Sequence, residues 1–168
     1  FYLVFIHQAK RILKSEELRW FLAIIAIAVL LISINLISTS YGVSNAFRDS
    51  FFTVASIIST TGYSTALFDH WPLFSQLILI LLMFVGGMAG STAGGLKVSR
   101  ILLLVKIGWA EIKQTIRPNR VVAIDYEGRR IDSILTNTVL SYLVVYIIIF
   151  IVAVLVISLE TPNLLSSF

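Results

Sequence analysis

The chain contains no cysteine among its 168 residues, and only 13% of those residues are charged. The absence of cysteine excludes disulfide bonds, thiolate metal sites and a cysteine nucleophile. Soluble domains contain about 25% charged residues, so this chain has too few charges to cover a surface that faces water. Hydrophobic residues make up 58% of the chain, and the mean hydropathy is +0.94. These values exclude a soluble globular domain, a disordered segment, a collagen and a coiled-coil rod.

The few charges leave long uncharged stretches, and these stretches predict membrane-spanning helices. Residues 20–37 and residues 133–159 are each long and apolar enough to cross a bilayer as one helix. Residues 71–96 are also uncharged, but glycines crowd the second half of that stretch. The apolar opening, residues 1–6, is interpreted as the end of an upstream helix, because the charges follow the apolar run instead of preceding it.

The lysines and arginines indicate how these spans are oriented. The formal net charge is +4, and basic residues gather before the first span and between the second and third spans. Because cytoplasmic loops of membrane proteins are enriched in Lys and Arg, we expect residues 1–19 and about 106–131 to face the cytoplasm. Residues 39–72 and the C-terminus are then expected to face outward.

A short apolar segment lies between Asp49 and Asp69 and cannot span a bilayer. Its core, residues 51–58, would cover about 12 Å as a helix, less than half of the hydrocarbon thickness. Polar, glycine-bearing sequence follows at residues 59–65, so the segment is predicted to be a half-helix with a re-entrant loop. A short interfacial helix with an outer loop is the alternative. Asp49 would suit the positive end of the half-helix. Asp49 and Asp69 would either attract cations to the mouth of a pore or cap helices in solvent.

The residues after this half-helix have the chemistry of a K⁺ filter, in which backbone carbonyls replace the water around a dehydrated ion. Glycine permits the backbone torsion that turns a carbonyl in an unusual direction. The candidate filter residues are Thr60, Thr61, Gly62 and Tyr63.

A glycine-rich break interrupts the middle stretch. Residues 73–85 and 96–109 are predicted to be half-helices of about 20 Å each, and the break between them, residues 86–96, is predicted to be a gate in the ion path. Helix packing through small residues four apart is the alternative. A phosphate-binding loop is excluded, because Gly95 is followed by Leu96 and not by Lys-Ser or Lys-Thr. The candidate gate residues are Gly86, Gly87, Gly90, Ser91, Thr92, Gly94, Gly95 and Lys97.

Lys97 has two interpretations. It either extends to the cytoplasmic interface or holds the glycine loop through the loop's carbonyl groups. No nucleophile, base and acid set is present in the sequence, so an enzyme is not expected. A small hairpin is predicted within residues 121–131, turning at Glu127 and Gly128.

Residues 51–100 resemble the Trk/Ktr/HKT superfamily of potassium transport proteins, and are most similar to its bacterial TrkH-type membrane subunit. The stretches that carry the resemblance are residues 59–65, 71–74 and 86–98. It implies an all-α membrane protein with four helix–pore loop–helix repeats in one chain, around a pore gated by a glycine loop. By this resemblance residues 1–15 end a preceding repeat, 16–109 form one repeat, 110–131 are a cytoplasmic segment and 132–168 begin the next repeat.

The same resemblance implies transport of K⁺ across the bacterial inner membrane by a multi-pass protein. K⁺ would be the transported ion, bound at the carbonyls of Thr60, Thr61, Gly62 and Tyr63, with no further cofactor. Implied partners are the remaining repeats of the pore, a second copy in a homodimer, a cytoplasmic ring of nucleotide-binding regulatory subunits, and lipids; no nucleic acid is expected. The rival interpretations are a two-span homotetrameric K⁺ channel and a non-transporting membrane scaffold.

Overall fold

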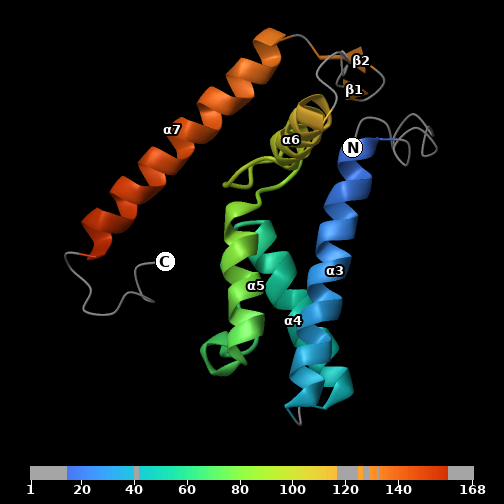
Figure 1. Ribbon diagram of the computed structural model, residues 1–168. Coiled ribbons are helices and arrows are strands. Elements are labelled where there is room, and N and C mark those ends of the chain that lie inside the picture. Colours follow the sequence, from blue (N-terminus) through green and yellow to red (C-terminus); the bar gives the residue numbers. More distant parts are fainter. Residues whose placement is uncertain (1–14, 40–41, 117–124, 127–128, 132, 159–168) are drawn as a thin grey trace. The chain divides into compact units, whose positions relative to one another are not determined.

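The computed structural model describes residues 15–39, 42–116, 125–126, 129–131 and 133–158 (Figure 1). The predicted end of a preceding repeat, residues 1–15, lies almost wholly outside this described part. The regular structure of the described part is helical apart from one small hairpin and one isolated bridge, which confirms the predicted all-α class. The chain divides into two compact units, residues 1–102 and 103–168. The elements, in chain order, are α3 (Glu16–Ser38), α4 (Val43–Ile58), η1 (Phe68–His70), α5 (Leu73–Phe84), α6 (Val98–Ile116), β1 (Asp125–Tyr126), β2 (Arg129–Arg130) and α7 (Ser133–Ser158).

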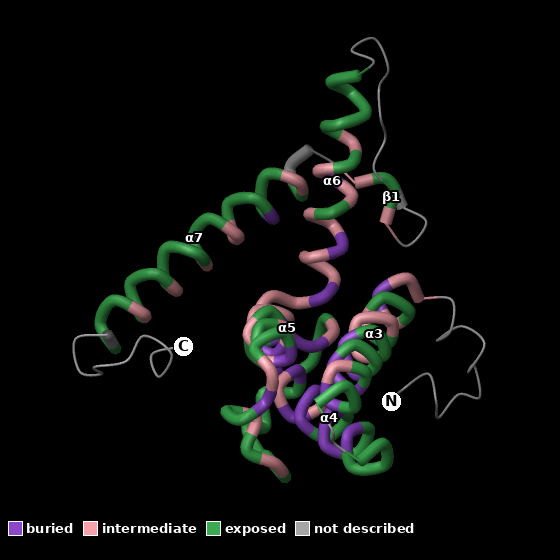
Figure 2. Tube along the Cα trace, turned by 60° about the horizontal axis from the view of Figure 1, so that its bottom comes forward, coloured by how far each residue is buried: buried purple, intermediate pink, exposed green. Residues whose placement is uncertain are grey.

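Two helices in the described part are long and apolar enough to cross a membrane: α3 over Glu16–Ser38 and α7 over Leu135–Ile157. Each of these stretches has 23 residues, or about 35 Å at 1.5 Å per residue. Both predicted uncharged spans are therefore confirmed as continuous helices. Figure 2 shows that α7 is mostly exposed, as expected of a helix whose apolar surface faces lipid or other helices.

The core of the first unit lies between α3, α4 and α5, which pack against one another. Ile32 and Leu36 of α3 are completely or almost completely buried, as is Leu79 of α5. The buried residues of these helices lie on the sides that face each other (Figure 2). Polar side chains join the same helices: the Ser75 hydroxyl donates to the Asn35 amide oxygen at 2.7 Å. Asn35 thus bonds a neighbouring helix, as polar side chains within membrane spans commonly do.

The short helix α4 begins earlier than the sequence predicts. It covers Val43–Ile58, 16 residues, whereas only residues 51–58 were expected to be helical. Arg48 and Asp49 therefore lie inside the helix, and the expectation that Asp49 lies at the helix start is wrong. The cause is burial: the Asp49 side chain packs inside the unit with only 4% of the residue exposed, so its charge does not mark a solvated helix end.

The predicted glycine-rich break between two half-helices is confirmed. Helix α5 ends at Phe84 and α6 begins at Val98, and no helix is present between them. The second half-helix continues to Ile116, seven residues beyond the predicted end. This extension is polar and exposed, with Glu111, Lys113 and Gln114 on its surface, so apolarity alone could not reveal it.

The predicted hairpin is present in the second unit. Asp125 pairs with Arg130 and Tyr126 with Arg129 in antiparallel register, while its predicted turn at residues 127–128 lies outside the described residues. Lys106 of α6 donates from its ammonium to the Asp125 carbonyl at 2.7 Å and lies 5.7 Å from the centre of the Tyr126 ring. These contacts fasten the hairpin to α6.

Replacing Ser50 with alanine is expected to lower the stability of the folded protein by about 1 kcal/mol. The Ser33 and Ser50 hydroxyls, 2.6 Å apart, join α3 to α4 in the core, and Ser50 is completely buried. Thermal unfolding of the detergent-solubilised protein measures the effect. Ser44→Ala is the control, because Ser44 is on the same helix but exposed. Equal midpoints for the two variants would contradict a role for the buried pair.

Candidate functional site

The candidate filter segment begins where α4 ends. The Thr60 N–H donates to the Ile57 carbonyl at 3.0 Å, and the Thr61 N–H donates to the Ser56 carbonyl at 2.9 Å. This pair of bonds is a Schellman motif, which satisfies the last carbonyls of a helix and normally needs glycine at the left-handed position. Here Thr60 occupies that position with a φ of 55°. A β-branched residue is strained in that conformation, so the surroundings must hold it.

Gly62 has a φ of 79°, in the left-handed region that glycine adopts without strain. A Cβ added at Gly62 would meet no atom within 4 Å. The backbone torsion, not a lack of space, therefore accounts for glycine at this position. The role of this torsion in aiming a filter carbonyl stays a prediction.

The four candidate filter residues are exposed in this chain, and Tyr63 is 72% exposed. Residues 61–64 have neither helical nor strand structure. An exposed backbone outside helices and strands leaves its carbonyl oxygens accessible, which is the property that an ion-coordinating segment needs.

The glycine-rich segment, defined here as residues 85–97, is a compact loop with a closed base. Val85 and Leu96 form a parallel bridge. The Gly86 N–H donates to the Leu96 carbonyl at 2.8 Å, and the Leu96 N–H donates to the Phe84 carbonyl at 2.9 Å. A Cβ at Gly86 would overlap the Gly94 carbonyl, and one at Gly95 would lie 3.0 Å from the Gly86 nitrogen. The glycines thus allow backbone to contact backbone, which a continuous helix with small-residue packing would not require.

The tip of this segment also depends on small residues. A Cβ at Gly87 would lie 2.5 Å from the Ser91 hydroxyl, and Gly90 has a φ of 81°. The Ala93 N–H donates to the Ser91 hydroxyl at 3.1 Å. Thr92, a further candidate residue, is exposed at the tip.

Lys97 holds the glycine-rich segment through two carbonyls, as one of its two interpretations predicts. Its ammonium donates to the Ser91 carbonyl and to the Ala93 carbonyl, each at 2.6 Å. Hydrogen bonds with a charged donor are shorter and stronger than neutral ones. Lys97 therefore fixes the tip of the segment to its own base.

A hydrogen bond joins the candidate filter to the glycine-rich segment. The Gly94 N–H donates to the Thr60 hydroxyl at 3.2 Å, although the two residues are 34 positions apart. The sequence predicts both segments but not their contact. This bond also helps to explain why a threonine occupies the strained position after α4, where glycine would have no hydroxyl to offer.

Glu17 also contacts the glycine-rich segment, although little in the sequence indicates this contact. Its Oε1 accepts a hydrogen bond from the Ala89 N–H at 2.6 Å, and Glu17 is only 7% exposed. The available signal was an acid at the start of an apolar helix, which a helix N-terminus favours in any case.

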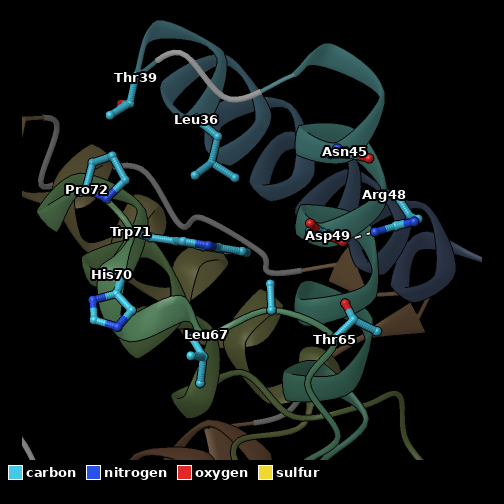
Figure 3. Close-up of a pocket in the computed structure, with 11 residues that line it drawn as sticks. Leu36, Thr39, Asn45, Arg48, Asp49, Thr65, Leu67, His70, Trp71 and Pro72 are labelled. Atoms are coloured by element: carbon cyan, nitrogen blue, oxygen red, sulfur yellow. Dashed lines mark hydrogen bonds and ion pairs between the residues drawn. The ribbon is translucent and has the colours of Figure 1, made fainter.

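A pocket of about 570 Å³ lies next to the residues that follow the candidate filter (Figure 3). Arg48 and Asp49 of α4, joined by an ion pair of 3.2 Å, line it together with Trp71 and Thr65. The pocket does not include Thr60, Thr61, Gly62 or Tyr63.

The two acids that flank the short segment differ in exposure. Because Asp49 is buried, it is not a solvated cap. Asp69 is exposed, and its attraction for cations stays a prediction.

Comparisons with known proteins agree on one family. The family model described as TrkH, a cation transport protein, matches residues 4–168. The Trk system potassium uptake protein TrkH of Escherichia coli strain K12 is 41% identical over 110 residues, which cover 66% of this chain and 23% of the relative. TrkG of the same strain, also a Trk system potassium uptake protein, is 29% identical over 160 residues, which cover 95% of this chain and 33% of the relative.

A solved structure is similar over almost all of the chain. The crystal structure of the potassium transporter TrkH from Vibrio parahaemolyticus is 34% identical in sequence and superposes with a TM-score of 0.88. The match covers 96% of this chain and 35% of that structure. The chain thus spans about a quarter to a third of the length of the proteins that it matches.

Proposed function

Because the chain belongs to the TrkH family of cation transport proteins, we propose that it forms part of the pore of a bacterial K⁺ uptake protein. The family is one of multi-pass proteins of the cytoplasmic membrane, and two helices in the described part of this chain can span the bilayer. Relatives named Trk potassium uptake proteins support K⁺ as the transported ion. Family membership also disfavours an enzyme, because transport through a pore needs no catalytic group.

In this proposal the carbonyls of Thr60, Thr61, Gly62 and Tyr63 coordinate K⁺. Two observations support it: the segment follows the C-terminal, negative end of a short helix, and Gly62 has the left-handed torsion that reorients a carbonyl. The Thr60 hydroxyl already accepts the Gly94 N–H. We therefore assign the coordination of K⁺ at Thr60 to the backbone carbonyl and not to the side-chain hydroxyl.

The glycine-rich segment is the proposed gate. The observation that carries the proposal is the Gly94 N–H bond to the Thr60 hydroxyl, because it places the segment directly against the candidate filter. Small side chains leave the segment free to change its backbone torsions once its anchoring bonds break. The contacts described above then belong to the arrangement that closes the ion path.

The assembled pore would require the partners that the resemblance implies. These are the remaining repeats of the pore, a second copy in a homodimer, a cytoplasmic nucleotide-binding regulatory ring and surrounding lipids. The two rival functions explain less. A two-span homotetrameric channel does not account for α7 or for the break between α5 and α6, and a scaffold does not account for the left-handed Gly62.

Replacing Gly62 with serine in the full-length protein is expected to lower the K⁺/Na⁺ flux ratio roughly tenfold. A residue with a Cβ is disfavoured at a φ of 79° by about 1–2 kcal/mol, and a tenfold change corresponds to about 1.4 kcal/mol. Flux of each ion into proteoliposomes measures the ratio.

Gly42→Ser is the matched control for this experiment. Gly42 caps α4 with a φ of −60°, where serine is a favoured residue, and an added Cβ would meet only Asn45, at 3.9 Å. We expect its flux ratio to equal that of the wild type. If Gly62→Ser folds and keeps both the flux and the K⁺/Na⁺ ratio of the wild type, the assignment of the filter to residues 60–63 is wrong.

A further inference from the structure

Glu17 is a buried acid whose position the proposed pore does not by itself explain. It lies in the first turn of α3, and only 7% of the residue is exposed. Burying a carboxylate is costly unless hydrogen bonds compensate for the lost water. The N-terminus of α3 supplies part of that compensation through its dipole. The Ala89 N–H supplies a short bond of 2.6 Å from a residue 72 positions away.

The bonds of the glycine-rich segment differ between its base and its tip. Backbone bonds close the base, between residues 84–87 and 96–98. The tip is held by side chains from three different parts of the chain: Glu17 on α3, Thr60 after α4, and Lys97 beside α6. Bonds made by side chains can break one at a time while the base stays closed. The tip is therefore the part that can move without unfolding α5 or α6.

We propose that Glu17 is a positioning residue that locks the tip of the glycine-rich segment in its closed arrangement. Opening of the gate then requires the Ala89 N–H to leave the Glu17 carboxylate. The proposal rests on the proposed function of the segment as a gate. It adds a physical connection from the start of a membrane-spanning helix to that gate, because a shift of the first turn of α3 would withdraw the acceptor from Ala89.

The hydrogen bond between Glu17 and Ala89 is strong enough to control the equilibrium between the closed and the released arrangement of the tip. A hydrogen bond to a charged group contributes enough to change the ratio of two states roughly tenfold or more. A glutamine at position 17 keeps a carbonyl acceptor but loses the charge, whereas an alanine loses the acceptor altogether. The two variants should therefore release the tip to different degrees.

The test uses the full-length protein and two measurements. In proteoliposomes without any activating partner, we expect Glu17→Ala to raise K⁺ flux about tenfold, Glu17→Gln to raise it less, and neither to change the K⁺/Na⁺ ratio. Amide hydrogen exchange is the second measurement, and we expect faster exchange at residues 88–90 in both variants. Glu16→Gln removes the same charge from the same turn, and we expect it to behave as the wild type in both measurements.

Three results would overturn the proposal. The first is faster exchange at residues 88–90 with unchanged flux, which would make the bond structural only. The second is unchanged exchange and unchanged flux, which would show that Glu17 is not an anchor. The third is an equal rise of flux in Glu16→Gln, which would assign the effect to charge alone. If Glu17→Ala does not fold, Glu17→Gln decides between the same outcomes.

If the glycine-rich segment is not a gate, flux and hydrogen exchange give a different combination of results. The exchange measurement does not depend on transport, so it reports the Glu17 anchor even if no variant of this chain alters flux. If exchange rises in the Glu17 variants while substitutions within the glycine-rich segment leave flux unchanged, the anchor is present but the segment is not a gate.

Discussion

Replacing Gly86 with alanine is expected to raise the resting K⁺ flux of the full-length protein well over tenfold. The added Cβ would overlap the carbonyl oxygen of Gly94 and would lie 3.1 Å from the carbonyl carbon of Gly95. Backbone atoms cannot rotate away as a flexible side chain can. The Gly86 N–H is also bonded to the Leu96 carbonyl at 2.8 Å, so the whole base of the segment would have to separate. Flux into proteoliposomes without an activating partner measures the result.

Two controls separate this overlap from the mere addition of a methyl group. A Cβ at Gly94 would meet only the Thr60 side chain, at an ordinary contact distance of 3.6 Å, so Gly94→Ala should change flux far less. A Cβ at Gly108 would meet nothing within 4 Å, and alanine favours the helix there, so Gly108→Ala should leave flux unchanged. A folded Gly86→Ala protein with wild-type flux would show that closure of the base does not block ions.

Replacing Lys97 with methionine is expected to raise resting K⁺ flux at least tenfold while leaving the K⁺/Na⁺ ratio unchanged. Methionine keeps most of the apolar length of the side chain but removes both bonds to the Ser91 and Ala93 carbonyls. Each bond has a charged donor, and such bonds contribute about 1.5–3 kcal/mol. The tip would then lack the anchor that fixes it to its own base. Parallel flux measurements with K⁺ and Na⁺ test both parts of the expectation.

Loss of a positive charge near the ion path is the competing explanation for such a rise. Lys113→Met removes the same charge from α6 at an exposed position in its last turn, so it controls for this effect. We expect its flux to remain close to that of the wild type. An equal rise in both variants would assign the effect to electrostatics, and no rise in Lys97→Met would remove Lys97 from the gate.

Hydrophobic patterning was sufficient to predict most of the helical architecture. Long, largely apolar stretches without charge predict α3 and α7, because a bilayer leaves few alternatives to a helix for such sequences. The glycine run predicts the break between α5 and α6 for an equally local reason, since five glycines between residues 86 and 95 cannot sustain a helix. Where one local cause dominates, the sequence is informative.

The first half of α4 could not be predicted in the same way. Arg48 and Asp49 are adjacent charges next to a polar stretch, which is typical of a loop in contact with water. In the structure, the two side chains pair, and Asp49 is buried inside the first unit. Only tertiary packing makes a helix with an internal carboxylate favourable, and packing is not visible in a local pattern.

The hydrogen bonds that join distant parts of the candidate site also could not be predicted from local sequence. Both segments are predictable from their composition, and the contact of Lys97 with nearby carbonyls is one of the two interpretations of that residue, because donor and acceptors are within six residues. The bonds from Thr60 to Gly94 and from Glu17 to Ala89 join residues 34 and 72 positions apart. A threonine and a glutamate have many ordinary uses in a helical protein, so neither residue type identifies such a partner.

The hydrogen bond of the Thr60 hydroxyl offers a way for K⁺ in the proposed filter to influence the proposed gate. Its backbone belongs to the proposed filter, while its side chain holds Gly94 of the proposed gate. Two events that share one residue are thermodynamically linked: if docking of the gate changes the affinity of the filter for K⁺, occupancy by K⁺ changes docking by the same factor. External K⁺ would then influence its own rate of entry, and a cation that blocks the filter would bind the open and closed forms with different affinities.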